Sequence, residues 1–366
     1  MIAIIGAGPA GIALARGLDR HGIDYEIFER ERVASTWRST PSDLRVLSPW
    51  WTNILSAGSI LKENPLGKVP SKRYLRHLLT LSESIEGKIH ENEPVVSIFP
   101  GAQSGWEIAT AKGRRETFDS VVVATGYFAN PYQPDLDSDG SIPCFHAQTI
   151  RNYSQLDTFK NATDPIAVVG SRVTAGQIVL ELADRGIQSV ICARSPIEFR
   201  RHGPISWLRE MLYFVWEELE CQLRPGLHRN SYPGMEGGRN RKLVEDGTVP
   251  LRPPIQRIRN RRLEFGDSTV QAAAGVIFAT GYRPALNIEG LEINLGREEL
   301  PELDGFQMVS MPGVYLLGFD NIYDHRSRYL RGIRRDASRL CALLASISAS
   351  SKIDSKPNRG RRTQDR

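Results

Sequence analysis

The chain has 366 residues, a hydrophobic content of 40% and a formal net charge of +5. This length exceeds one compact core and suits two domains of an ordinary globular protein. No apolar run reaches the roughly 18 residues that a membrane span needs, and a strand-like run begins at Met1 without room for a secretory signal. Composition therefore favours a cytoplasmic protein and excludes an integral membrane segment.

The cysteines and the basic residues exclude further classes of protein. Cys144, Cys192, Cys221 and Cys341 are far apart and show neither C-x-x-C nor metal-ligand spacing, so we expect no disulfide framework and no metal site. A share of the positive charge lies in residues 350–366, which are too poor in apolar residues to order themselves and are predicted to form a disordered basic tail. No aromatic-interleaved groove accompanies the charge, so nucleic acid is not expected as a partner.

The first eleven residues form an apolar strand and a G-x-G-x-x-G turn that opens a helix. Gly6 permits the tight turn, Gly8 lets a pyrophosphate approach the backbone, and Gly11 lets helix and strand pack closely. A second strand over 25–29 places Glu29 roughly twenty residues downstream, where a carboxylate accepts hydrogen bonds from ribose hydroxyls. These residues predict a dinucleotide site.

Residues 34–53 are rich in aromatic residues, proline and hydroxyls and lack a helical period. Loops of this kind can line a pocket, while core packing is an equally good interpretation of Trp37, Trp50 and Trp51 taken singly. The next segment, 70–81, is predicted to be a covering helix with a serine cap, on which His77 is solvated. Strands are predicted over 94–99, 105–109 and 116–118.

A second copy of the opening plan follows. Residues 166–176 repeat the strand and turn, with a helix over 174–185 and a strand over 189–193. Each copy ends in an apolar strand with the sequence Ala-Thr-Gly-Tyr, at 124–127 and at 279–282, about 110 to 120 residues after its turn. The repetition predicts two dinucleotide sites.

An insertion near 196–250 interrupts the second copy. It contains a helix over 205–219 that is apolar over a broad face. This helix can be a substrate lid, a dimer contact or a membrane-surface helix, and its acidic residues disfavour the last of these. Those residues are Glu210, Glu217, Glu218 and Glu220. A homodimer is therefore left open.

The chain closes with a strand over 313–318, an acid at Asp320 and a helix over 336–345. Together with the two interleaved modules, this arrangement resembles the two-dinucleotide-binding-domain flavoproteins and, within them, the flavin-containing monooxygenases. The resemblance covers residues 1–345. It implies an α/β fold with two Rossmann-like domains, the second inserted in the first. The FAD-binding domain would comprise 1–150 and 285–349, and the NADPH-binding domain 151–284.

The resemblance also implies the cofactor-binding residues. The ADP half of FAD would be held by Gly6, Gly8, Pro9, Gly11 and Glu29, beside Trp37 and Arg38, which match the family's Gly-Gly-Thr-Trp stretch. The NADPH pyrophosphate would be held by Gly170, Thr174 and Ala175, with Arg194 and Ser195 at the end of the second strand. The expected set is completed by Ala10, Arg30, Thr125, Gly126, Arg172, Thr280, Gly281 and Asp320. No catalytic side chain is assigned.

Two arginines distinguish the second site. Arg194 replaces the acid that a ribose 2′-hydroxyl requires and offers a bidentate fork to a 2′-phosphate, which favours NADPH over NADH. Arg172 stands where the middle glycine belongs, so it either clamps the nucleotide or marks a module that no longer binds one. The family's histidine signature is degenerate over 142–146, and His146 is expected to be a hydrogen-bonded linker residue.

Three classes of function remain. In the favoured class, NADPH reduces FAD, molecular oxygen forms a flavin (hydro)peroxide, and one oxygen atom passes to a small-molecule substrate in an N-, S- or Baeyer-Villiger-type oxidation. The alternative is a thioredoxin-reductase-like flavoprotein without redox cysteines, which passes electrons to ferredoxin or a quinone. A non-catalytic nucleotide sensor is the third.

Overall fold

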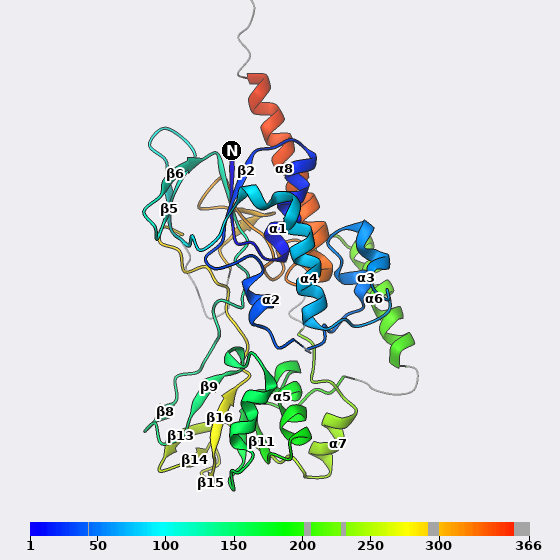
Figure 1. Ribbon diagram of the computed structural model, residues 1–366, viewed down its shortest axis with the longest axis vertical. Helices are drawn as coiled ribbons and strands as arrows, with labels where there is room; N and C mark the ends of the chain where they lie inside the picture. The colour runs from blue at the N-terminus through cyan, green and yellow to red at the C-terminus, as the bar shows by residue number, and fades with distance from the viewer. Residues whose placement is uncertain (43, 201–205, 228–231, 292–299, 355–366) are drawn as a thin grey trace, which may run out of the picture.

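The structure is a computed structural model that describes residues 1–42, 44–200, 206–227, 232–291 and 300–354 (Figure 1). Its larger sheet has the strand order β17-β18-β19-β7-β1-β2-β3. The strands are β1 Ile2–Ile5, β2 Tyr25–Phe28, β3 Ile89–His90, β7 Ser120–Val123, β17 Leu303–Asp304, β18 Gln307–Met308 and β19 Val314–Leu316. The central strand β1 pairs in parallel with β2 and β7, and all four of its residues are buried. Such continuous apolar strands are typical of a parallel sheet that is covered on both faces.

The smaller sheet repeats this plan with the order β12-β11-β10-β16-β9. Its strands are β9 Cys144–His146, β10 Ile166–Val169, β11 Ser189–Cys192, β12 Leu251–Arg252 and β16 Gly275–Phe278. The central strand β10 pairs in parallel with β11 and β16, as β1 does with β2 and β7. The predicted α/β architecture with two Rossmann-like modules is therefore present.

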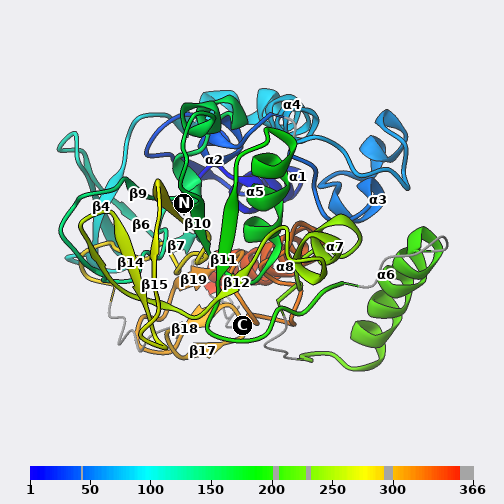
Figure 2. The same cartoon turned by 90° about the horizontal axis from the view of Figure 1, so that it is seen from below.

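Helices cover both sheets. In the larger module, α1 Pro9–Arg20 packs along α8 Leu330–Asp354, with α4 Ser71–Ser82 beside them (Figure 1). The smaller module has α5 Val173–Asp184 and α7 Arg239–Glu245, and α6 Ser206–Leu223 projects at the edge of the molecule (Figure 2). No helix in the described part of the chain is long and apolar enough to cross a membrane.

Two small sheets complete the fold. One contains β4 Val95–Pro100, β5 Trp106–Thr110 and β6 Arg115–Phe118, which confirms the three strands predicted there. The other contains β8 Asp137–Ser138, β13 Ile255–Arg259, β14 Arg262–Phe265 and β15 Val270–Ala272. The predicted closing helix is the middle part of α8, which continues to Asp354, five residues into the segment predicted as a tail. Residues 355–366 lie outside the described part of the chain.

The predictions for residues 34–81 need correction. The stretch predicted as a loop contains two short helices, α2 Ser35–Ser39 and α3 Trp50–Asn53. The predicted covering helix exists, but Ser71 is its first residue and not its cap, because the Ser71 hydroxyl donates to the Pro41 carbonyl (2.6 Å). His77 is buried and not solvated.

Candidate active site

Each module has a glycine turn at the carboxyl end of its central strand. Gly6 has φ +109°, and a Cβ there would lie 2.7 Å from the Ala124 carbonyl oxygen. Gly170 has φ +146°, and a Cβ there would lie 2.5 Å from the Ala279 carbonyl oxygen. Both positions therefore require glycine, for its backbone freedom and for its size. The two Ala-Thr-Gly ends close against the two turns in the same way.

The first turn leads into the N-terminus of a helix, where the first backbone N–H groups have no partner within the helix. Helix α1 begins at Pro9, and its N-cap Gly8 supplies no side-chain cap. A Cβ on Gly8 would meet no atom within 4 Å, whereas a Cβ on Gly11 would lie 2.0 Å from the Gly6 carbonyl oxygen. Gly8 thus faces the space that a ligand can fill, and Gly11 is a packing position. A pyrophosphate fits this arrangement.

Glu29 is buried and already makes hydrogen bonds. Its Oε2 accepts from the Ala7 N–H (2.8 Å), and its Oε1 accepts from the Glu31 N–H (3.1 Å) and the Ser35 hydroxyl (3.3 Å). The carboxylate therefore fixes the turn and the segment after β2. A carboxylate has about four lone-pair directions, so acceptor capacity remains for a ligand.

The second turn is covered by part of the insertion. Arg172 is the N-cap of α5, and its Nη1 donates to the Tyr232 carbonyl (2.7 Å) while its guanidinium lies 5.2 Å from the centre of the Tyr232 ring. The backbone of Arg172 also forms a bridge with Gly234. Ala175, at the position of the third glycine, is fully buried. Arg172 therefore holds residues 232–234 against the start of α5.

One cavity of about 2140 Å³ joins the two turns. It is more than twice the upper end of the range of about 300–1,000 Å³ that is usual for a site holding one small ligand. The predicted cofactor residues that line it are Gly6, Gly8, Pro9, Ala10, Glu29, Arg30, Trp37, Thr125, Gly126, Gly170, Arg172, Thr174, Arg194, Ser195, Thr280, Gly281 and Asp320. Gly11 and Ala175 instead pack the turns. Arg38 is exposed and outside the lining, and its Nε donates to the Val33 carbonyl (2.8 Å).

The Ala-Thr-Gly ends also bind the chain where it crosses between the modules. Thr125 Oγ1 donates to the Ala285 carbonyl (2.6 Å), and the Ala285 N–H donates to Gly126 (2.8 Å). Thr280 Oγ1 donates to the Tyr132 carbonyl, and the Tyr132 N–H donates to Gly281 (2.9 Å). The end of β7 in the larger module is thus bonded to the segment that returns from the smaller module. The end of β16 in the smaller module is bonded to the segment that comes from the larger module. The sequence shows the repeated threonine but not its backbone partner.

Asp320 lies in a group of aromatic and charged residues that the sequence did not predict. Its Oδ2 accepts from the Tyr127 hydroxyl (2.9 Å) and from Arg328 Nη1 (2.9 Å). The Arg328 guanidinium lies 4.7 Å from the centre of the Tyr127 ring and 4.8 Å from that of Tyr232. Burial and the Asp320 charge raise the pKa of Tyr127, so its hydroxyl stays protonated and donates. No sequence pattern connects these residues.

The predicted aromatic stretch divides between cavity and core. Trp37 lines the cavity and contacts Tyr74 (ring centres 4.4 Å apart). Trp50 is buried, and its Nε1 donates to the Ser59 carbonyl (2.9 Å). Trp51 is half-buried and does not line the cavity. Of the three tryptophans, only Trp37 therefore has the predicted place at a pocket.

His77 packs edge-on against Trp50, with ring centres 5.0 Å apart. Its Nε2 accepts from the Leu55 N–H (3.4 Å). Burial, reinforced by the charges of Lys62 and Arg16, lowers the pKa of His77 to about 4. His77 is thus a neutral core residue. His146 is buried too, and its Nε2 lies 3.0 Å from the Gly281 carbonyl oxygen, as expected of a hydrogen-bonded linker residue.

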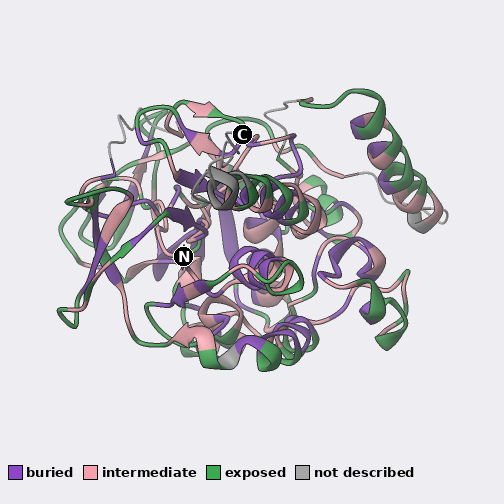
Figure 3. Ribbon diagram, turned by 90° about the horizontal axis from the view of Figure 1, so that it is seen from above, coloured by how far each residue is buried: buried purple, intermediate pink, exposed green. Residues whose placement is uncertain are grey.

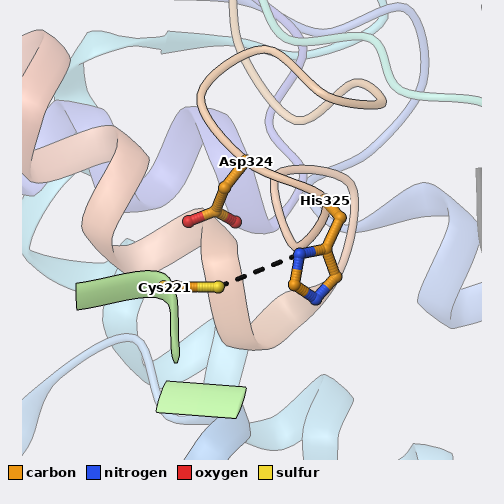
Figure 4. Close-up of side chains that lie close together, drawn as sticks. All are labelled: Cys221, Asp324 and His325. Atoms are coloured by element: carbon orange, nitrogen blue, oxygen red, sulfur yellow. Dashed lines mark hydrogen bonds between the residues drawn. The ribbon is translucent and has the colours of Figure 1, made fainter. Parts of the chain in front are cut away.

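Cys221 comes together with the adjacent residues Asp324 and His325, which follow it about a hundred residues later in the chain (Figure 4). Their ligand-type atoms lie within 4.8 Å of one another. The Asp324 carboxylate, however, is held by Arg326 (Oδ2 to Nη2, 2.6 Å), and His325 Nε2 lies 3.2 Å from Glu217 Oε1. Protein groups therefore already balance these charges, and we interpret the cluster as the anchor of α6.

The fold and the cavity define the class of two-nucleotide flavoprotein oxidoreductases. A model of the pyridine nucleotide-disulphide oxidoreductase family matches residues 3–224, and the chain belongs to this family.

Relatives and solved structures agree with this class. An "uncharacterized oxidoreductase CzcO-like" of Geobacillus kaustophilus (strain HTA426) is 26% identical, over 93% of this chain and 96% of its own length. Flavin-containing monooxygenase 1 of Rattus norvegicus is also 26% identical, over 77% of this chain, which spans only 62% of that relative.

Among solved structures, the flavin-containing monooxygenase from Stenotrophomonas maltophilia has a TM-score of 0.76 at 19% identity and covers 95% of this chain and 98% of its own. A bacillithiol disulfide reductase from Bacillus cereus has a TM-score of 0.68 at 17% identity and covers 95% and 99%. The predicted fold class and the predicted resemblance to flavin-containing monooxygenases are confirmed. The chain is an FAD-dependent oxidoreductase.

Proposed function

We propose that the protein is a monooxygenase that uses NADPH, FAD and molecular oxygen to oxidise a small molecule at nitrogen, sulfur or a carbonyl carbon. The observation that carries this proposal is the single cavity that joins both glycine turns and leaves further volume beside them. FAD supplies the redox and oxygen chemistry when it is bound, and the chain supplies binding, orientation and exclusion of water.

The two turns divide the cofactors between them. The N–H groups at the start of α1, beside the open face of Gly8, would hold the pyrophosphate of FAD, and Glu29 would accept from its ribose. In the second module, Gly170 and Thr174 would hold the NADPH pyrophosphate, with Arg172 closing residues 232–234 over it. The resemblance and the lining both support this division.

Aromatic side chains in the cavity lining favour an oxygenase. Tyr213 and Phe214 of α6 and Trp37 of α2 line it, and such walls exclude water from reactive oxygen chemistry. The alternative, a reductase, has in its favour the similarity to the bacillithiol disulfide reductase fold. A disulfide mechanism is not supported, because all four cysteines are free and lie in separate elements: β9, β11, α6 and α8.

Rapid mixing tests the proposal. The FAD-bound protein is reduced with NADPH and mixed with oxygen while the flavin absorbance is followed. A monooxygenase shows a transient spectrum distinct from reduced and oxidised flavin, which NADP⁺ prolongs and substrate shortens. Labelled oxygen then appears in the product. Direct return to oxidised flavin with every substrate tried, together with fast turnover on ferredoxin or a quinone, would establish the reductase instead.

Arg194 tests the choice of nicotinamide cofactor. It lines the cavity after β11, and we propose that it binds the 2′-phosphate. Arg194→Ala should lower kcat/KM for NADPH by an amount equivalent to about 1.5–3 kcal/mol, as for the loss of a hydrogen bond to a charged group. The value of kcat/KM for NADH should remain nearly unchanged. Arg262→Ala on β14, outside the cavity lining, is the matched control. An equal loss with both cofactors would mean that Arg194 is structural.

A further inference from the structure

Helix α6 turns an apolar stripe toward solvent. Leu212, Trp216 and Leu223 are 56%, 61% and 77% exposed, and Val215 and Leu219 are exposed between them. Their spacing places all five on one side of a helix of 3.6 residues per turn. The helix stands at the edge of the molecule in Figures 2 and 3. Isolated surface leucines are ordinary, but a contiguous stripe on a projecting helix marks an interaction surface.

The opposite side of α6 is fixed to the body of the protein. The Glu217 carboxylate is buried and accepts from Arg331 Nε (2.6 Å) and Nη2 (2.9 Å). Next to it, Cys221 is buried beside His325 (Sγ to Nδ1, 3.8 Å), as Figure 4 shows. Glu218 pairs with Arg326 (3.1 Å). The apolar stripe faces solvent on a helix whose other side is fixed to the protein. Its exposure is therefore not a result of loose placement of α6.

In the sequence, four glutamates of this helix disfavour a membrane-surface helix. In the structure, these glutamates do not belong to the exposed stripe. Glu217 and Glu218 are the residues anchored to the protein body. Glu210 pairs with Lys68 (3.0 Å) and Arg200 (3.0 Å). The side chain of Glu220 is only 13% exposed and lies 3.9 Å from Arg224. Among the described positions of α6 that are exposed, none is acidic.

Cations stand at both ends of the stripe. Arg209 is exposed near the start of α6, and the Arg224 side chain, just after its end, is 71% exposed. The Lys68–Glu210 ion pair also ties residues 63–68 to the start of the helix, where Leu66 is 53% exposed. The surface thus combines apolar side chains, an exposed tryptophan and two exposed arginines, of which Arg224 has a long contact with the largely buried Glu220 (3.9 Å).

We propose that this surface docks the protein on a membrane that contains anionic lipids, without spanning it. The leucines and Trp216 would enter the interface between headgroups and acyl chains, and Arg209 and Arg224 would contact lipid phosphates. Tyr213 and Phe214 of the same helix line the cavity, so docking brings the edge of the cavity to the membrane.

Charge argues against a second copy of the chain as the occupant. A two-fold symmetric contact brings the same surface of both copies together. If the two α6 helices pair in parallel, Arg209 meets Arg209 and Arg224 meets Arg224. If they pair antiparallel about Trp216, Arg209 approaches Arg224. Either arrangement opposes like charges with no exposed acid on the stripe to balance them, whereas an anionic lipid surface complements both arginines.

Vesicle sedimentation of the full-length, FAD-bound protein tests the proposal. We expect binding to vesicles of phosphatidylcholine mixed equally with phosphatidylglycerol, and weaker binding to phosphatidylcholine alone. Leu219→Asp should lower the partition coefficient at least tenfold, because it removes a leucine side chain whose burial in the membrane is worth about 1.5–3 kcal/mol. Arg224→Gln should lower it about fivefold on the anionic vesicles only, which corresponds to about 1 kcal/mol per arginine. Trp216 emission should shift to the blue on binding, a shift that Trp216→Phe removes.

Val270→Asp is the matched control, because Val270 is 51% exposed on β15, away from α6. It should bind vesicles as the unmodified protein does. Flavin absorbance and circular dichroism establish that each variant is folded. Failure of the unmodified protein to bind either vesicle overturns the proposal, and so does full binding by folded Leu219→Asp. Dimers in sedimentation velocity that Leu219→Asp dissociates, without vesicle binding, would assign the surface to a second copy.

Discussion

Gly8 and Gly11 belong to the same fingerprint but have different structural roles. A Cβ on Gly8 would point into open space, whereas one on Gly11 would collide with the Gly6 carbonyl at 2.0 Å. Gly8→Ala should therefore leave the melting temperature of the apoprotein unchanged. It should lower the affinity for FAD about tenfold or more, because the added methyl group would occupy the place of the pyrophosphate. Fluorescence titration with FAD and thermal unfolding measure the two effects.

Gly11→Ala is the informative comparison. It should lower both FAD affinity and the melting temperature, since helix and strand must move apart. If Gly8→Ala bound FAD as tightly as the unmodified protein, the open face of Gly8 would not be the cradle.

His77 makes stability depend on pH. Its pKa is lowered from 6.5 to about 4 by burial, so below pH 6.5 the unfolded chain binds a proton that the folded protein excludes. Its contribution is fully present above pH 6.5 and is lost as the pH falls toward 4. Between pH 7.5 and pH 5 this single group should cost about 2 kcal/mol of unfolding free energy.

His77→Gln keeps an acceptor for the Leu55 N–H but does not titrate, so the variant should lose about 2 kcal/mol less than the unmodified protein over this pH interval. Urea unfolding at the two pH values measures the difference. Parallel losses in both proteins would show that His77 is protonated in the folded state. His21, which is exposed on the turn after α1, is the control position.

Sequence reasoning succeeded at residues whose conformation is set locally and failed where a distant segment decides. Gly6 and Gly170 could be assigned to their turns because consecutive residues encode the strand, the turn and the helix. His77 could not, since its burial depends on Trp50, a residue in another helix. Ser71 precedes a helical pattern as a cap would, yet Pro41 takes its hydroxyl.

At the scale of the element, the buried Glu217 carboxylate is one of the contacts that fix α6 to the protein body. Burial alone would raise the pKa of Glu217, but hydrogen bonds from His325 and Arg331 outweigh it and lower the pKa to about 2. The interaction stabilises the folded state above pH 4.5 and is lost as the pH falls toward 2. Glu217→Gln leaves Arg331 without its buried partner and should cost about 3–5 kcal/mol at pH 7.

Hydrogen exchange of the α6 amides and urea unfolding check this prediction. The difference between Glu217→Gln and the unmodified protein should narrow as the pH is lowered below 4.5. Glu245→Gln on α7 is the control, because its pair with Arg241 is exposed and long (3.8 Å), and such pairs contribute less than about 1 kcal/mol. Unchanged exchange in α6 would mean that its other contacts hold the helix without the Glu217 carboxylate.

Elements with a strong period were predictable and irregular ones were not. The strands β4, β5 and β6 and the helix α4 follow from alternation and helical spacing. The helices α2 and α3 are only five and four residues long, too short for a period to show. The helix α6 was predicted, but which of its sides faces solvent follows from the positions of Arg326 and Arg331, about a hundred residues later in the chain.

The whole molecule repeats one plan twice, and the repeat includes the connections. Thr125 and Thr280 occupy the same place in their modules, and each donates to the segment that crosses from the other module. The sequence predicts the two modules because the glycine turn and the Ala-Thr-Gly end both recur. It cannot predict how the modules are tied, since the acceptors are the backbone carbonyls of Ala285 and Tyr132.

These two hydroxyls should set how firmly the modules are held together. Thr125→Val and Thr280→Val keep the shape of each side chain and remove its donor, at about 0.5–1.5 kcal/mol each. The double variant should retain FAD in the larger module while hydrogen exchange rises at the Ala285 and Tyr132 amides, which bond to Gly126 and Gly281. A calorimetric scan should then resolve two transitions where the unmodified protein shows one. Thr158→Val, which removes a hydroxyl that donates to the nearby Gln155 carbonyl (3.0 Å), should change neither measurement. One sharp transition in the double variant, with unchanged exchange at both crossings, would show that apolar packing between the modules holds them and that the threonines only shape the turns.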